Sequence, residues 1–224
     1  MNTNSFEEKI PKTFKKHDTV IKIRSFFYPF KRRKLNRVGV CVLECLKKVN
    51  IQYPISIEFN NSSAFSKYAV GQIDSWSFIN YKIRIYYNPR YISLDLKELV
   101  KTGIHEYCHI IYRQKELFSD PSLEHFLKID YHPFKITIDC LTQKYFTEVI
   151  NKIPTQDRMD FEKTKNIREE IFVEVLAEYI LGTQNESIIA DSQHFQTIIS
   201  THIQIMNKIR FPKFREPEKL DLKI

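Results

Sequence analysis

His105, Glu106 and His109 belong to the pentapeptide His-Glu-Tyr-Cys-His, in which the two histidines lie four positions apart. On a helix, residues at this spacing share one face about one turn apart, so both imidazoles can reach the same metal ion. The glutamate between them is placed to take a proton from a water on a zinc ion. The spacing therefore predicts a Zn²⁺ site with His105 and His109 as ligands and Glu106 as the general base of a hydrolytic reaction.

The segments on either side of this motif predict the elements that position it. Apolar residues recur at helical spacing through residues 95–115, and Asp95 followed by Glu98 has the form of a capping box. The two histidines lie beside the apolar stripe, where ligands at the floor of a cleft are expected. The alternating segment 81–87 predicts a strand, which Pro89 ends. A strand that leads into an HExxH helix is the order of elements in zincins.

The remaining patterns predict an α+β, zincin-like fold with a small, mostly antiparallel sheet packed on the motif helix and a helical C-terminal half. Alternating apolar residues predict further strands at 55–59 and 68–73. Helical periodicity predicts further helices at 35–48, 135–152, 167–181 and 188–209. The charged residues from Pro154 to about residue 166 are expected to form an irregular connection.

Length and composition limit the class of protein. A chain of 224 residues with 42% hydrophobic residues can bury its own core. The sequence has no run of about 18 apolar residues, which excludes a membrane-spanning helix, and its first residues lack the apolar stretch of a secretory signal. The four cysteines form no CxxC pair. Without a signal or a disulfide framework, an intracellular, cytoplasmic setting is favoured.

The net charge of +8 is concentrated near the N-terminus, because residues 1–37 hold eleven Lys and Arg against three Asp and Glu. Aromatic residues are interleaved with these basic residues. Such a segment can bind nucleic acid, lie on an anionic membrane surface, or form a solvated arm that its aromatic residues anchor. We therefore expect a basic arm at 1–34 that is a candidate for nucleic-acid binding, a metallopeptidase domain at 35–210 and a tail at 211–224.

A third zinc ligand is expected downstream of His109, because catalytic zinc usually has three protein ligands and one open position. The apolar helix predicted at 167–181 carries Glu170, Glu174 and Glu178, which are four residues apart and line one ridge. Three carboxylates on a ridge repel one another without a cation or basic partners, and a zinc ion would relieve that repulsion. The alternative is an ordinary amphipathic helix whose glutamates face water.

The motif helix followed by Glu170-Ile-Phe-Val-Glu174-Val-Leu-Ala177 resembles the gluzincin arrangement, in which the second helix has the form Glu-x-x-(small)-(Glu/Asn)-x-(apolar)-Ala. The chain is similar to minimal gluzincins of the ImmA/IrrE type and to anthrax-lethal-factor-like peptidase domains. The resemblance covers the element order of residues 35–182. It implies a zinc metallopeptidase in which Glu170 is the third ligand and Glu174 hydrogen-bonds a ligand histidine.

A second resemblance is to the SprT/Spartan-like metalloproteases, which cut proteins attached to DNA. It is based on residues 85–92 together with residues 99–109, which contain the motif. That family takes its third histidine shortly after the motif, in a His-Gly-x-x-Phe setting. His125 and His132 fall in this region without the glycine and are alternative ligands, and the basic arm suits this resemblance.

Two classes of function are open. In a zinc-dependent peptidase, zinc would lower the pKa of a bound water, and Glu106 would pass the proton to the leaving amine. A protein or peptide substrate would pair with residues 82–86 as an edge strand. Tyr179, His194 and His202 are candidates for stabilising the oxyanion. In the other class, the protein is a non-enzymatic nucleic-acid-binding or regulatory protein whose HExxH fold is a relic.

Overall fold

The computed structural model describes residues 29–52, 55–59, 69–73, 83–117, 128–164, 166–183 and 185–209. The chain divides into two compact units. The first unit comprises residues 1–109 and 180–183, and the second comprises residues 110–179 and 184–224. The helix that carries the HExxH motif, α2 (Leu96–Leu117), is continuous and contributes residues to both units.

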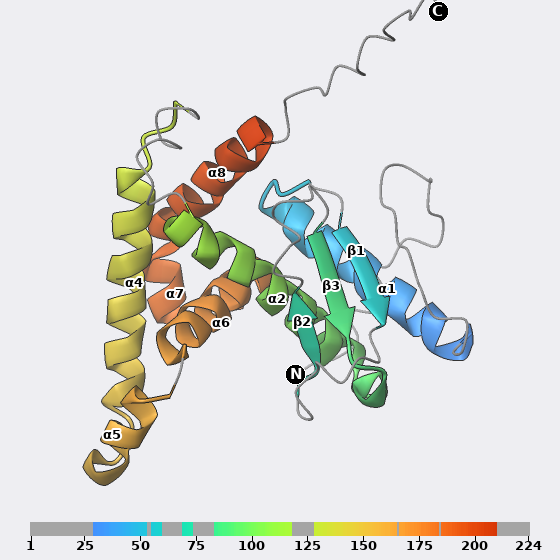
Figure 1. The fold of residues 1–224 in the computed structure, drawn as a ribbon, viewed down its shortest axis with the longest axis horizontal. Helices are drawn as coiled ribbons and strands as arrows, with labels where there is room; N and C mark the ends of the chain where they lie inside the picture. Colours follow the sequence, from blue (N-terminus) through green and yellow to red (C-terminus); the bar gives the residue numbers. More distant parts are fainter. Residues whose placement is uncertain are drawn as a thin grey trace, which may run out of the picture. The chain divides into compact units, whose positions relative to one another are not determined.

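The first unit contains a long helix and a three-stranded sheet (Figure 1). Helix α1 spans Pro29–Lys48, and strands β1, β2 and β3 span Ile55–Phe59, Gly71–Ile73 and Ile83–Tyr87. In each strand every second residue is buried, as expected when one face of a sheet covers a core. Helix α1 contacts β1 and contributes several fully buried residues to this core: Leu35, Val38, Val42 and Leu46.

The sheet is mixed, because β3 lies between the other two described strands. Strand β3 pairs in parallel with β1 and antiparallel with β2. Apolar alternation predicts where a strand lies and which face is buried, but it does not determine which strands become neighbours. The prediction of a mostly antiparallel sheet is therefore wrong. The prediction that residues 82–86 form an edge strand is also wrong, since residues 83–86 lie in the central strand.

The start of α2 follows the predicted capping pattern. The Asp95 Oδ1 atom accepts a hydrogen bond of 2.8 Å from the backbone N–H of Glu98, which confirms the predicted cap. Before it, the short 3-10 helix η2 (Pro89–Tyr91) begins where the Asn88 side chain accepts a hydrogen bond of 3.0 Å from the Arg90 N–H. These side-chain caps end β3 and start α2 within a few residues.

A glycine and a buried tyrosine bring α2 close to the sheet. The hydroxyl of Tyr87, on β3, donates a hydrogen bond of 2.6 Å to the carbonyl oxygen of Leu99. A Cβ atom on Gly103 would collide with the Tyr87 hydroxyl and with Val42 Cγ2 on α1. Only glycine therefore permits this spacing between α1, β3 and α2.

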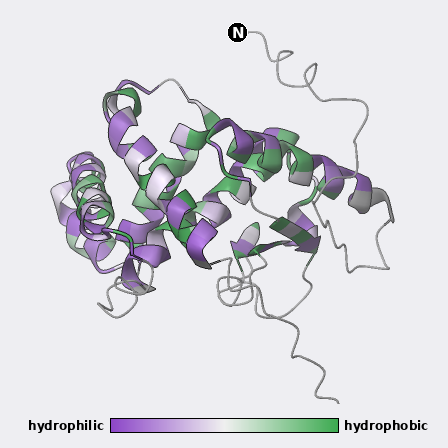
Figure 2. Cartoon of the chain, turned by 90° about the horizontal axis from the view of Figure 1, so that it is seen from above, coloured by the Kyte–Doolittle hydropathy of each residue, from purple (hydrophilic) through white to green (hydrophobic). Residues whose placement is uncertain are grey.

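The described residues of the second unit form helices joined by turns. They comprise α2 from Ile110 onward together with α4 (His132–Ile150), α5 (Thr155–Glu162), α6 (Ile167–Leu181, whose last two residues belong to the first unit), α7 (Glu186–Ala190) and α8 (Ser192–Ile209). Helix α8 contacts α4 and α7. Hydrophobic and hydrophilic residues alternate along these helices (Figure 2), and the buried side chains include Phe134, Ile138, Phe172 and Phe195. None of the described helices combines the length and apolar character needed to cross a membrane.

Two predictions for the second unit are wrong. Residues after Pro154 form helix α5 instead of an irregular connection; none of its residues is buried, so no apolar periodicity marked it. The single helix expected at 188–209 is divided at Asp191 into α7 and α8. The Asp191 carboxylate accepts hydrogen bonds from Lys144 (2.6 Å) and Tyr145 (2.8 Å) on α4, partners that are remote in the sequence.

Helix α1 begins at Pro29, earlier than the helix predicted from Leu35, and so includes the end of the predicted basic arm. The ammonium group of Lys31 donates to the carbonyl oxygen of Pro89 at 3.2 Å, and that of Lys34 donates to the carbonyl oxygens of Ser93 and Leu94. These contacts join α1 to the segment that leads into α2. Residues 1–28 lie outside the described residues, so nucleic-acid binding by the arm stays a prediction.

These contacts predict a stabilising role for two basic residues. The double substitution Lys31→Met, Lys34→Met removes both ammonium groups but keeps their aliphatic stems, and we expect the thermal midpoint to fall by roughly 2–4 °C. The matched control is Arg33→Met, Arg37→Met, which removes the same charge from exposed side chains of the same helix. Equal midpoints for the two double variants, measured by circular dichroism, would contradict this role.

Candidate metal centre

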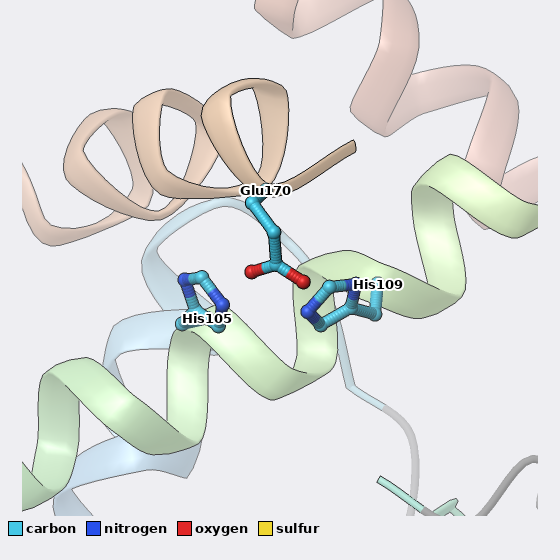
Figure 3. A group of neighbouring side chains, drawn as sticks. All are labelled: His105, His109 and Glu170. Carbon is cyan, nitrogen blue, oxygen red and sulfur yellow. The ribbon is translucent and has the colours of Figure 1, made fainter. Parts of the chain in front are cut away.

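His105 and His109 lie one turn apart on α2, and both rings project from the same side of the helix (Figure 3). Their ring centroids are 5.0 Å apart and the ring planes are inclined by 79°. His109 is 5% exposed and His105 is partly buried. The two imidazoles thus have the arrangement that their spacing in the sequence predicted.

Glu170, in the first turn of α6, joins the two histidines. A ring nitrogen from each histidine and a carboxylate oxygen of Glu170 all lie within 4.8 Å of one another, and Figure 3 shows the carboxylate directed towards the rings. Ligand atoms of a tetrahedral zinc ion, bonded at about 2.0–2.2 Å, are about 3.3–3.5 Å apart. The three residues could therefore hold a metal ion, and their donor atoms are of the kinds that bind zinc.

Contacts within the second unit hold the first turns of α6 against the part of α2 that follows the motif. The rings of Tyr112 and Phe172 pack with their centroids 5.4 Å apart. The Arg113 Nε–H donates to Glu169 Oε1 at 3.1 Å, and the Glu169 side chain is only 13% exposed. Phe172 and Glu169 lie on either side of Glu170 in the sequence, so these contacts help to place its carboxylate. Arg113 was not predicted from the sequence, although its position four residues after His109 puts it on the same helix face.

The other described candidates for the third ligand are not part of this group. Glu174 and Glu178 are partly buried on α6 and do not belong to the group of three. His132 is exposed at the start of α4 and is also outside the group. His125 lies outside the described residues. Of the described candidates for the third ligand, Glu170 is the one that lies with the two histidines. Its role as a ligand stays a prediction.

Glu106 lies on α2 where the edge strand β2 comes close to the helix. A Cβ atom built on Gly71 would lie 3.3 Å from Glu106 Cγ. Gly71 was not predicted from the sequence to have a role, although an isolated glycine within a strand pattern is typical of a close backbone approach. Burial, together with the nearby Glu106 carboxylate, raises the pKa of Tyr87 far above its usual value. The hydroxyl therefore stays protonated and can donate its hydrogen bond to the carbonyl oxygen of Leu99.

The three candidates for stabilising an oxyanion lie in the second unit. Tyr179 stacks on Phe195 with the ring centroids 4.9 Å apart. His194 has a side chain that is 61% exposed, and its Nδ1 atom lies 3.6 Å from Asp191 Oδ1. His202 is completely buried. No contact of these side chains identifies one of them as an oxyanion donor, so that prediction stays open.

Comparisons with models of protein families, with curated proteins and with solved structures find no match. The two family resemblances of the sequence therefore stay predictions. A functional proposal for this chain depends on its own residues and their geometry.

His202 predicts how stability depends on pH. Its Nδ1 atom lies 2.8 Å from Gln114 Oε1, and burial lowers the pKa of the ring to about 3, compared with about 6.5 in an unfolded chain. Between these pH values the unfolded chain binds a proton that the folded chain does not. The free energy of unfolding should therefore fall as the pH falls below about 6.5, by up to about 1.4 kcal/mol per pH unit from this group.

Replacing this ring should weaken the pH dependence. His202→Gln cannot take up the proton, so urea denaturation between pH 7 and pH 5 should show a smaller loss of stability for this variant than for the wild type. His194→Gln, at an exposed ring, is the control and should retain most of the wild-type slope. Parallel slopes for His202→Gln and the wild type would show that His202 does not titrate as expected.

Proposed function

We propose that the protein is a zinc-dependent peptidase in which His105, His109 and Glu170 bind the ion and Glu106 is the general base. The observation that carries the proposal is the group of two imidazoles and one carboxylate whose ligand atoms lie within 4.8 Å of one another. This donor set is found in catalytic zinc sites, where the fourth position is open to water or substrate.

The residue between the two histidines favours hydrolysis over other chemistry. Two histidines and one carboxylate also bind iron in oxygenases, so the donor set alone does not decide the reaction. Glu106 is one residue from His105 and three residues from His109 on a continuous helix. A carboxylate at this position can exchange protons with a molecule bound at the histidines, as a hydrolase requires.

Each residue of the proposed site then has a defined role in peptide hydrolysis. The bound ion supplies Lewis acidity, which acidifies a water molecule and polarises a carbonyl group. Glu106 accepts the proton of the attacking water and delivers it to the leaving amine. His105, His109 and Glu170 hold the ion, and the burial of His109 limits the access of bulk water to that side of the site.

The edge of β2 suggests how a substrate would bind. Val70 lies opposite Asn88, whose N–H donates to the Val70 carbonyl oxygen at 2.9 Å. Because hydrogen-bonded and non-hydrogen-bonded pairs alternate in an antiparallel ladder, the N–H and C=O groups of Gly71 point away from β3. No described strand pairs with this outer edge. An extended polypeptide could add there and would lie beside Glu106, so β2 replaces residues 82–86 as the proposed substrate strand.

Metal content tests the proposed ligands. The wild type should retain about one zinc ion per chain after dialysis, and His105→Ala, His109→Ala and Glu170→Gln should lose it, since each removes one of three ligands. Glu174→Gln and Glu178→Gln are matched controls on the same ridge and should retain zinc, even if affinity falls by about 10–100-fold at a supporting residue.

Two outcomes of this measurement, made by elemental analysis, would contradict the proposal. Full zinc content in Glu170→Gln would remove Glu170 from the ligand set. A wild type that binds no metal would favour the non-enzymatic class of function.

Activity tests the role of Glu106 separately from metal binding. Glu106→Gln keeps the shape of the side chain but cannot accept a proton, so it should retain zinc while kcat falls by about 100- to 10,000-fold. The measurement compares turnover of a peptide mixture by the wild type and the variant at equal zinc content. Unchanged kcat in Glu106→Gln would exclude Glu106 as the general base.

A further inference from the structure

We infer that Gly71 is a positioning residue for Glu106. The absence of a side chain at this point of β2 lets the strand lie against α2 at the proposed general base. This role rests on the proposed function, because it has a meaning for catalysis only if Glu106 is the base.

The space around Gly71 is occupied by two side chains of α2. A Cβ atom built on Gly71 would lie 2.6 Å from Thr102 Cγ2, 3.3 Å from Glu106 Cγ and 3.5 Å from the carbonyl oxygen of Tyr86. Separations under 3.0 Å essentially do not occur for real Cβ atoms, so an alanine would displace either the strand or Thr102. The contact with Glu106 Cγ would in addition press on the carbon that sets the direction of the carboxylate.

Thr102 cannot easily move its methyl group away. Its Oγ1–H donates a hydrogen bond of 3.0 Å to the carbonyl oxygen of Glu98, which fixes the rotation of the side chain. The Cγ2 methyl therefore stays directed at β2. Replacement by serine would remove the methyl and keep the hydroxyl, which opens the space at Thr102 but not the space at Glu106.

The glycine at position 71 is explained by space and not by backbone conformation. Among the described glycines only Gly182 has a positive φ, so Gly71 has a backbone that other residues can adopt. Gly103 is a useful comparison, because its missing side chain makes room for Tyr87 and Val42. An alanine at Gly103 would strain the packing of the same helix without facing Glu106.

The experiment compares Gly71→Ala, Thr102→Ser, the double variant Gly71→Ala, Thr102→Ser, and the control Gly103→Ala. Zinc content, thermal midpoint, kcat and KM are measured for each, together with the visible absorption spectrum after replacement of zinc by Co²⁺. We expect Gly71→Ala to retain zinc, to unfold at a lower temperature, and to lose roughly 10- to 100-fold in kcat, because a shift of about 1 Å at a reacting group has this effect.

The double variant separates catalysis from packing. It should regain most of the thermal midpoint, because the collision with the Thr102 methyl is gone. Its kcat should stay low, and its Co²⁺ spectrum should differ from that of the wild type in the same way as the spectrum of Gly71→Ala. Gly103→Ala should lower the midpoint and leave the Co²⁺ spectrum like that of the wild type.

The possible results distinguish this inference from the proposed function. Recovery of both midpoint and kcat in the double variant would show that Gly71 serves packing only, and a wild-type kcat in Gly71→Ala would likewise overturn the inference alone. The same spectral shift in Gly103→Ala would also overturn it, since any disturbance of α2 would then suffice. A wild type without bound metal would overturn the proposed function and the inference with it.

Discussion

The close approach of α2 to β3 at Gly103 is the contact on which the first unit depends. No larger side chain fits there beside the Tyr87 hydroxyl, and that hydroxyl also donates to the carbonyl oxygen of Leu99 one turn earlier. Two contacts one turn apart fix both the height of the helix over the sheet and its rotation about its own axis. The HExxH motif begins within the next turn of the same helix. The stability of the unit that carries the motif therefore depends on a packing constraint that lies outside the motif.

The position of the third proposed ligand, Glu170, depends on a different set of contacts. Glu170 is exposed and belongs to another helix, so its carboxylate reaches the histidines only if α6 is held in place. The ion pair between Arg113 and Glu169 and the packing of Tyr112 on Phe172 provide this support within the second unit. Because α2 is continuous, the residues that support α6 follow His105 and His109 on the same helix, within about one turn of His109. The same helix therefore carries two of the proposed ligands and the residues that anchor the helix of the third.

Local patterns predicted much of the fold, because they depend on neighbours in the sequence. Strand β1 and helix α6 have the predicted bounds, and the HExxH spacing placed both histidines on one helix face. Properties that depend on distant residues were not predictable in this way. The order of the strands, the break at Asp191 and the choice among three glutamates of equal spacing all depend on tertiary contacts. Helix α5 was not predicted because it lacks the local pattern itself: it buries no residue, so its sequence has no apolar periodicity.

The proposal that two histidines and one glutamate form a zinc site is tested most directly by X-ray absorption at the zinc edge of the purified protein. A zinc ion held by these three residues should have nitrogen and oxygen ligands at about 2.0–2.2 Å, scattering from two imidazole rings beyond them, and no sulfur ligand. A sulfur ligand at about 2.3 Å would place the ion on one of the cysteines, and an absence of zinc would remove the metal from the site altogether. Either result would contradict the central claim.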